Sequence, residues 1–270
     1  MTPVISVVIP CWNAERWLAE TLESVAVQAR HGLTLETIVV DDGSTDRSVS
    51  IAERYGATIE RCAHLGVSFA RNAGTVRATG QYLQYLDADD VLMPATLEQR
   101  VDTLERTRSD VALTTWTRWT LQSDGQFADG TPVRRRLGHR PDVDLLTDAW
   151  WPPGAILYRR ETVDRVGSWR TDLPIIQDAR FLLDAALSGA SFVHVDEVGL
   201  RYRVHGEDSL SRKTPEAFVA DRYRSAADLH DRWLATGALD DERRAALVRV
   251  FGAIARGQFA SERAAFGMTV

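Results

Sequence analysis

Three aspartates, Asp87, Asp89 and Asp90, follow an apolar segment that ends at Leu86. Carboxylates this close together repel one another unless a cation or solvent relieves the repulsion. One or two carboxylates completed by phosphate oxygens are the ligands that Mg²⁺ and Mn²⁺ prefer. A divalent-ion site is therefore one interpretation of this cluster. The other is helix capping, in which Asp89 or Asp90 accepts from the amides of a helix beginning near Pro94.

A second acidic pair, Asp41 and Asp42, also follows an apolar segment. The run from Asp41 to Asp46 is good turn and capping chemistry by itself. In a doubly wound protein, an acidic residue after the second strand is also where a ribose or base is often bound. The segment after the first strand, Pro10 to Asn13, lacks both the GxGxxG and the Walker pattern, so any nucleotide is expected to be held through its base, its ribose and a metal-bridged diphosphate.

The elements that position these residues alternate between short Val- and Ile-rich runs and amphipathic stretches. Runs of this kind suit strands buried on both faces and joined by helical crossovers, which predicts an α/β fold with a doubly wound, mostly parallel sheet. The predicted strands are 4–10, 36–40, 57–62, 82–86, 110–120 and 155–158, and the predicted helices are 14–29, 46–55, 66–78, 97–108, a short one from about 161, and 178–188. The chain from Thr214 onward is predicted to form a helical C-terminal extension.

The net charge, the apolar segments and the cysteines of the chain limit the classes of function that it can have. The 270 residues carry a net charge of −6, which argues against nucleic acid as a partner. No stretch approaches the ~18 apolar residues of a transmembrane segment, and no cleavable leader begins the chain, so we expect a cytoplasmic protein, with a location peripheral to the membrane as the alternative. The two cysteines, Cys11 and Cys62, are expected to be free thiols. The basic run Arg134 to Arg136 is interpreted as a solvated loop.

Four motifs occur in the order and at the spacing of one known family. They are Val7-Val8-Ile9-Pro10-Cys11-Trp12-Asn13, then Val39-Val40-Asp41-Asp42-Gly43-Ser44-Thr45-Asp46, then Ala70-Arg71-Asn72-Ala73-Gly74, and finally Gly80-Gln81-Tyr82 with Leu86-Asp87-Ala88-Asp89-Asp90. With them the chain resembles the inverting family 2 glycosyltransferases of the GT-A fold. Weaker matches at Gln177-Asp178 and Tyr202-Arg203-Val204-His205 extend the resemblance to about residue 212.

The resemblance implies a nucleotide-diphospho-sugar donor and a divalent metal, Mn or Mg. By position, Asp42 is expected to read the donor base, and Arg71 to contact the diphosphate or base. Asp89 is expected to contact the metal directly, and Asp87 the ribose or the metal. The remaining expected donor-binding residues are Pro10 and Trp12 as a wall beside the base, together with Asn13 and Ala88 from the same motifs.

On the acceptor side, the resemblance implies that Asp178 is the general base that deprotonates the acceptor. Its alternative role is an N-cap of the predicted helix. The family often has Glu-Asp where this chain has Gln177-Asp178, and the missing glutamate leaves the acceptor contacts open. It often has Tyr where this chain has Trp12, which still offers an aromatic face for a base. His205 has two interpretations, as a metal ligand or as a structural histidine. For the tryptophans at 116, 119, 150, 151 and 169, core packing is the expectation, although each could stack on a sugar ring.

These inferences predict a glycosyltransferase domain over residues 1–212, with a nucleotide-sugar-binding half (1–109) and an acceptor-side half (110–212), followed by the extension 213–270. The expected function is metal-dependent, inverting transfer of a sugar from a UDP donor, with TDP or GDP as alternatives. The acceptor, a small molecule, peptide, glycan or lipid-linked sugar, is not identified by the sequence, and oligomerisation stays open. The competing functions are a nucleotidyltransferase and a nucleotide-sugar-binding protein without transferase activity.

Overall fold

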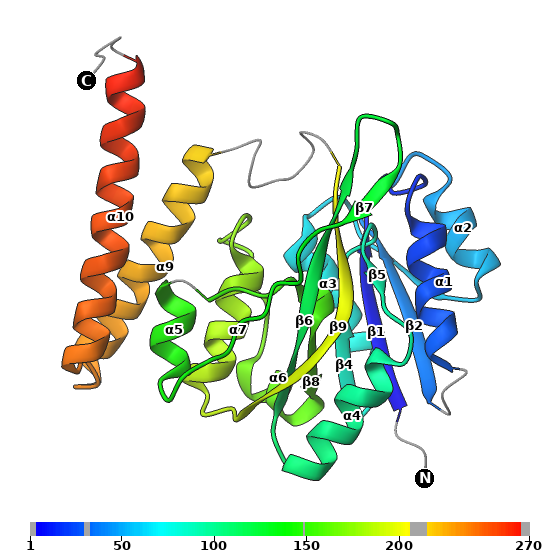
Figure 1. Ribbon diagram of the computed structural model, residues 1–270, viewed down its shortest axis with the longest axis horizontal. Helices are drawn as coiled ribbons and strands as arrows, with labels where there is room; N and C mark the ends of the chain where they lie inside the picture. Colours follow the sequence, from blue (N-terminus) through cyan, green and yellow to red (C-terminus); the bar gives the residue numbers. More distant parts are fainter. Residues whose placement is uncertain (1–3, 30–32, 148, 206–214, 266–270) are drawn as a thin grey trace.

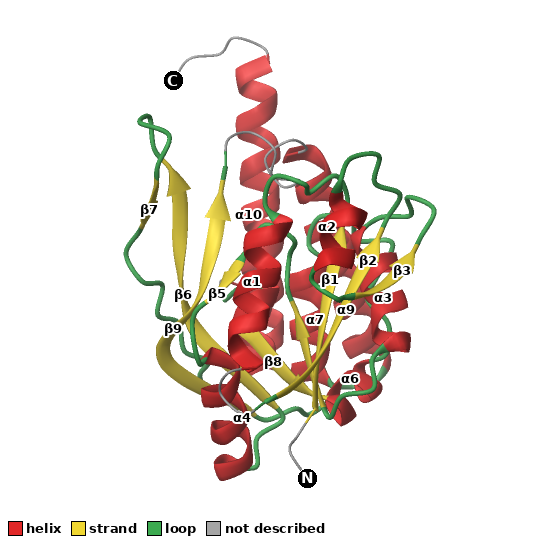
Figure 2. Ribbon diagram, turned by 90° about the vertical axis from the view of Figure 1, so that its right-hand side faces the viewer, coloured by secondary structure: helices red, strands yellow, loops and turns green. Residues whose placement is uncertain are grey.

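A computed structural model describes residues 4–29, 33–147, 149–205 and 215–265 of the chain. It is an α/β fold in which helices lie on both sides of one curled sheet (Figures 1 and 2). The sheet order is β3-β2-β1-β4-β8-β6-β9-β5, with β7 paired to β6. The strands are β1 (Val4–Cys11), β2 (Thr34–Asp41), β3 (Thr58–Arg61), β4 (Tyr82–Tyr85), β5 (Val91–Leu92), β6 (Val111–Leu121), β7 (Phe127–Asp129), β8 (Ile156–Arg159) and β9 (Phe192–Val204).

The first half of the sheet is parallel, as predicted. Strand β1 lies between β2 and β4, and β2 pairs with β3, all in the same direction. Helices cover both faces, so β1 is buried along most of its length, which explains why its sequence is a continuous apolar run. The carboxyl ends of β1, β2 and β4 consequently meet at one edge, where the acidic motifs begin.

The second half of the sheet is mixed. Strand β8 is antiparallel to both β4 and β6, whereas the long strands β6 and β9 run parallel. Their register shifts twice between Thr114 and Trp116, opposite the segment from Val195 to Leu200. An irregularity of this kind bends a strand and increases its twist. Since β8 is antiparallel to both β4 and β6, and β9 is parallel to β6, β9 runs in the same direction as β4 and ends at the acidic edge.

Helices follow the predicted ranges within a few residues. They are α1 (Leu18–Gln28), α2 (Ser48–Arg54), α3 (Val67–Arg77), α4 (Thr96–Thr107), α5 (Pro141–Thr147), α6 (Arg160–Val166), α7 (Gln177–Leu187), α9 (Pro215–Ala235) and α10 (Asp241–Ala265), with a 3-10 turn η2 (Pro153–Ala155). Sequence analysis gave no strand range for β9, which is thirteen residues long. It also missed α5, β5 and β7, which are seven, two and three residues long. Elements this short carry little periodic signal.

Helix α3 packs directly on the parallel strands. A Cβ added at Gly74 would lie 2.3 Å from Cγ1 of Val8 on β1 and 3.0 Å from Cγ2 of Val40 on β2. The absence of a side chain at this position therefore allows the close approach of helix and sheet. This close approach determines how near to the sheet Arg71 lies, since Arg71 is one turn earlier on the same helix.

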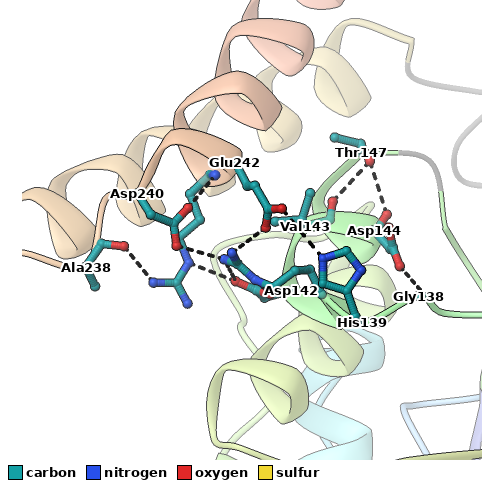
Figure 3. Close-up of polar contacts among 11 residues, drawn as sticks. Gly138, His139, Asp142, Val143, Asp144, Thr147, Ala238, Asp240 and Glu242 are labelled. Atoms are coloured by element: carbon teal, nitrogen blue, oxygen red, sulfur yellow. Dashed lines mark hydrogen bonds and ion pairs between the residues drawn. The ribbon is translucent and has the colours of Figure 1, made fainter.

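The C-terminal helices α9 and α10 pack beside α5 and α7. Arg140, just before α5, donates to Asp240 at 3.0 Å and pairs with Glu242 at the start of α10 (Figure 3). Arg243 of α10 donates to the Asp142 carboxylate at 2.8 Å, while Asp142 also pairs with Arg140. The extension is thus docked by a charged network. The predicted boundary at 212/213 lies outside the described residues, so the division into two units stays a prediction.

No helix within the described ranges is both long and apolar enough to cross a bilayer.

Candidate active site

The loops after β1 and β2 are tied to each other. The backbone N–H of Asn13 donates to Oγ of Ser44 at 3.0 Å, and the Asn13 side-chain oxygen accepts from the Thr45 N–H at 2.8 Å. Asn13 has a positive φ of 47°, a conformation that asparagine tolerates better than most residues. These contacts show Asn13 organising the two loops that sequence analysis assigned to donor binding.

Asp42 connects the loop after β2 to the loop before α3. Its two carboxylate oxygens accept from the backbone N–H groups of Leu65, at 2.8 Å, and Gly66, at 2.7 Å. The side chain is 6% exposed. A carboxylate has about four acceptor positions, so these two bonds leave capacity for a ligand donor. The base-reading role of Asp42 stays a prediction.

Trp12 presents an exposed aromatic surface beside Asp42. It is 55% exposed, and its ring lies 4.8 Å from that of His64, at an interplanar angle of 37°. His64 Nδ1 lies 3.1 Å from the carbonyl oxygen of Asp42. Pro10, at the end of β1, is half-buried next to this edge. The predicted wall for a nucleoside base therefore has an accessible aromatic face, with His64 as a member that sequence analysis missed.

The acidic loop after β4 is held from several elements. Arg71 of α3, only 2% exposed, places its Nη2 2.6 Å from Oδ1 of Asp87, and the carbonyl oxygen of Ala88 accepts from the Thr21 hydroxyl at 2.9 Å. The fully buried Asp90 accepts from the backbone N–H of Arg203 at 2.9 Å. Burial raises the pKa of Asp87 and of Asp90, while Arg71 opposes the rise at Asp87.

The capping interpretation of this loop is wrong. Helix α4 begins at Thr96 after Ala95, which has a left-handed conformation and provides no side-chain cap. Asp90 instead joins the loop to β9, because its partner is Arg203. The carbonyl oxygen of Asp89 also accepts from Arg203, whose Nε lies 2.6 Å away.

Asp89 and His205 meet side chain to side chain. Oδ2 of Asp89 lies 2.9 Å from Nε2 of His205. Adjacent ligands of an octahedral ion bound at 2.0–2.1 Å are about 3 Å apart, so this pair fits two neighbouring positions around Mg²⁺ or Mn²⁺. Within the described ranges, no group of three or more His, Cys, Asp or Glu side chains is arranged to hold a metal. A divalent-ion site at this pair stays a prediction, in which phosphate oxygens and water would supply the remaining ligands.

Arg203 is a central residue of the site that sequence analysis missed. Besides its bonds to Asp89 and Asp90, its guanidinium pairs with Glu20 at 2.6 Å. It also lies over the rings of Trp17, Trp119 and Phe127, at 4.5, 4.3 and 4.8 Å from their centroids. Arg203 thus connects the acidic loop, helix α1 and the β6–β7 hairpin. Its place in the Tyr202–His205 motif was the available signal.

Asp178 lies in the first turn of α7, and not at the cap, because the helix begins at Gln177 after Ile176. Its Oδ2 accepts from the indole Nε1 of Trp150 at 2.8 Å, and its Oδ1 accepts from the Ala179 N–H at 2.7 Å. Burial raises the pKa of this carboxyl above its usual range, and the nearby Arg71 guanidinium moderates the rise. A carboxylate with a raised pKa suits a general base.

An aromatic cluster lies next to Asp178 and the acidic loop. The rings of Trp116, Trp150 and Tyr202 contact one another edge to face, with centroids 5.5 to 5.8 Å apart. The pKa of the Tyr202 hydroxyl is raised by burial and then by the negative charges of the acidic loop and of Asp178. Tyr202 therefore lies within electrostatic reach of the predicted metal loop and of the predicted base, a role that sequence analysis did not assign.

Other residues behave as structural elements. Trp116, Trp151 and Trp169 are buried, as expected of core residues, whereas Trp119 and Trp150 are half-buried. The run Arg134 to Arg136 is in a loop, where Arg136 pairs with Asp196. Cys11 and Cys62 are free, and burial raises the pKa of the Cys11 thiol to about 11, which makes it a poor nucleophile.

With this geometry described, sequence comparison identifies the family. Residues 6–166 match the model of glycosyl transferase family 2, and the chain belongs to that family. One relative is the putative teichuronic acid biosynthesis glycosyltransferase TuaG of Bacillus subtilis, which is 31% identical over 242 residues, or 84% of this chain and 90% of TuaG. The chain spans between 52% and 68% of the length of three further relatives.

Structural comparison gives the same fold. Staphylococcus aureus TarS 1–349 in complex with UDP-GlcNAc has a TM-score of 0.61 at 18% identity, covering 94% of this chain and 80% of that one. The mannosyltransferase PcManGT of Pyrobaculum calidifontis, in complex with GDP-Man and Mn²⁺, also has a TM-score of 0.61 at 18% identity, covering 93% and 86%. The fold is therefore that of GT-A glycosyltransferases, as the motifs predicted, and family membership argues against the nucleotidyltransferase alternative.

Proposed function

We propose that this protein transfers a sugar from a nucleotide-diphosphate donor to an external acceptor, with inversion at the anomeric carbon. The observation that carries the proposal is the convergence of two acidic groups around Arg71. Its guanidinium contacts Asp87 of the acidic loop directly and also acts electrostatically on Asp178 of α7. Single displacement needs positive charge beside the departing diphosphate on one side and a base on the other. The acidic loop would hold the ion that supplies this charge, and Asp178 would be the base.

On the donor side, the nucleoside base is assigned to the exposed face of Trp12 and to the Asp42 carboxylate. Aromatic faces stack on bases, and a buried carboxylate accepts a ring N–H. Uracil and thymine offer such an N–H at N3, and guanine offers one at N1. UDP is therefore the first donor to test, with TDP and GDP as alternatives.

Asp89 and His205 are assigned to a divalent ion, Mn or Mg. When bound, such an ion supplies positive charge to the departing diphosphate. Two arginines from neighbouring elements hold the acidic loop in place. Arg203 fixes the Asp89 carbonyl and the Asp90 carboxylate, while Arg71 fixes Asp87. The Mn²⁺ in the PcManGT complex supports this assignment by analogy.

On the acceptor side, Asp178 is assigned as the general base. Each of its oxygens already accepts one hydrogen bond and retains a further acceptor position for the acceptor hydroxyl. The carboxylate removes the hydroxyl proton while the oxygen attacks the anomeric carbon from the face opposite the diphosphate. The acceptor stays unidentified.

The test is a pair of measurements on the wild type and Asp178→Asn. Substrates are chosen from the neighbours, beginning with UDP-GlcNAc and GDP-mannose, and both release of the nucleoside diphosphate and sugar transfer are followed. Transfer should fall by roughly two to four orders of magnitude in Asp178→Asn, the usual contribution of a positioned base. Donor affinity should stay unchanged, since this carboxylate is assigned to the acceptor.

Three results would contradict the proposal. Near-normal transfer by Asp178→Asn would remove the base assignment. NMR of the product showing the donor's anomeric configuration would overturn single displacement. Tight donor binding by the wild type without turnover, across donors and acceptors, would favour the nucleotide-sugar-binding alternative.

A further inference from the structure

Trp150 makes a directed contact with Asp178 from a distant part of the chain. The residue precedes η2, and its indole N–H donates to Oδ2 of Asp178 at 2.8 Å. The ring is itself held edge to face by Trp116, at 5.5 Å and 87°, and by Tyr202, at 5.8 Å and 83°. Because two neighbouring rings restrain the indole, its N–H has a defined direction.

We infer that Trp150 is a positioning residue for the general base, which it orients through this hydrogen bond. The inference rests on the proposed function, in which Asp178 is that base. Rotation about the last side-chain bond of an aspartate is loosely restrained by its own covalent geometry. One donor on each oxygen, the indole on Oδ2 and the Ala179 N–H on Oδ1, removes that freedom. The remaining acceptor positions of the carboxylate then keep a constant direction toward the acceptor hydroxyl.

The same bond affects the charge of the base. Hydrogen bonds to a carboxylate favour its ionised form, and here the indole opposes the effect of burial. The other groups acting on Asp178 are Arg71 of α3, which favours ionisation, and Asp87, which disfavours it. Tyr158 of β8 and Tyr202 of β9 also interact electrostatically with it. Loss of the indole N–H should therefore leave the carboxylate both less oriented and harder to ionise.

Trp116 provides a matched control within the same cluster. It contacts Trp150 and Tyr202 in the same edge-to-face manner and is 2% exposed. Its Nε1, however, has no hydrogen-bond partner among the described atoms. Trp116→Phe and Trp150→Phe make the same chemical change at neighbouring rings, and only Trp150→Phe removes a donor from Asp178. General damage to the cluster should affect both variants alike.

The first experiment needs no substrate. In the protein labelled with ¹⁵N at tryptophan, the indole resonance of Trp150, assigned by its loss in Trp150→Phe, should move with pH as Asp178 ionises. In Asp178→Asn that titration should disappear, while the resonance of Trp116 should not titrate in either protein. A Trp150 resonance that is independent of pH, or unaffected by Asp178→Asn, would overturn the inference.

The second experiment measures kcat/KM against pH, as nucleoside diphosphate release from the faster of UDP-GlcNAc and GDP-mannose. Trp150→Phe should lower the rate at neutral pH roughly tenfold and move the acid limb of the profile up by about one pH unit. Trp116→Phe, which keeps the indole donor and an aromatic ring against it, should change both quantities less. Combined with Asp178→Asn, Trp150→Phe should have little further effect. If Asp178→Asn abolishes activity but Trp150→Phe behaves like Trp116→Phe, the positioning role fails while the base assignment stands; if Asp178→Asn itself is active, the proposed base fails.

Discussion

Oδ2 of Asp89 and Nε2 of His205 lie 2.9 Å apart, although 116 positions separate the two residues in the chain. The contact forms because β9 runs in the same direction as β4 and ends at the same edge of the sheet. Arg203, two residues before His205, holds the end of β9 at this edge by donating hydrogen bonds to the carbonyl oxygen of Asp89 and the carboxylate of Asp90. The acidic loop and the end of β9 therefore form one structural unit.

This unit predicts metal-dependent donor binding. Calorimetry with UDP and Mn²⁺ should show affinity at least tenfold higher than in EDTA, because two protein ligands are completed by phosphate oxygens. In Asp89→Asn and His205→Ala, EDTA should have little additional effect. A matched control is the exposed pair His230 and Asp231 on α9, also 2.9 Å apart, whose substitution should leave binding unchanged. Undiminished wild-type affinity in EDTA would remove the metal from donor binding.

Base selectivity tests Asp42. The wild type should bind UDP, TDP and GDP better than CDP, because N3 of cytosine is an acceptor and cannot donate to the carboxylate. Asp42→Asn should reduce this discrimination about tenfold. It should also loosen the loop at Leu65 and Gly66, whose N–H groups both depend on the carboxylate. Competition binding with the four diphosphates provides the measurement, and equal affinities in the wild type would exclude the assignment.

The pH dependence of activity should report Asp178. Burial raises the pKa of its carboxyl, and a general base works only when ionised. Wild-type kcat/KM should therefore decline as pH falls, with an acid limb above the ~3.9 of an unperturbed aspartate. The residual activity of Asp178→Asn should lack this limb. An identical limb in that variant would assign the ionisation to another group.

The C-terminal helix α9 should contribute to the position of α7. Asp221 of α9 is 1% exposed, accepts from the Ile175 N–H at 2.8 Å and pairs with Arg224. Asp221→Ala removes the buried acceptor of that N–H, so it should lower the free energy of unfolding by about 1–3 kcal/mol and lower turnover more than donor affinity. Denaturant unfolding and calorimetry provide the measurements. Asp164→Ala, at a 61% exposed side chain, is the control and should have little effect.

Helix–sheet packing at Gly74 makes a stability prediction. Gly74→Ala places a methyl group 2.3 Å from Val8, so it should destabilise the protein by about 1–3 kcal/mol through overpacking. Gly252→Ala, within α10, meets only the flexible end of Arg256 at 3.4 Å and should stabilise slightly by improving helix propensity. Thermal unfolding of both variants distinguishes the two effects. If the unfolding temperatures of both variants shifted equally in the same direction, the close approach of α3 to the sheet would not limit the side-chain size at position 74.

The sequence by itself determined the parallel half of the sheet and the donor-side motifs. Strands such as β1 and β2 are continuous apolar runs because both of their faces are buried, and that pattern is local. The acidic segments directly follow these strands, so their meeting at one edge follows from parallel topology alone. Short elements such as β5 and α5 escaped prediction because a few residues carry too little periodicity.

The partners of the acidic and basic side chains were decided by tertiary structure. The pairing of Asp89 with His205 depends on the parallel alignment of β9 with β4 in the sheet. The bond between Trp150 and Asp178 depends on an aromatic cluster drawn from three segments, and Asp90 binds Arg203 instead of capping a helix. Each contact joins residues 28 to 116 positions apart. Local sequence propensity does not encode contacts between residues this far apart in the chain. They form only when the two halves of the sheet come together in one fold.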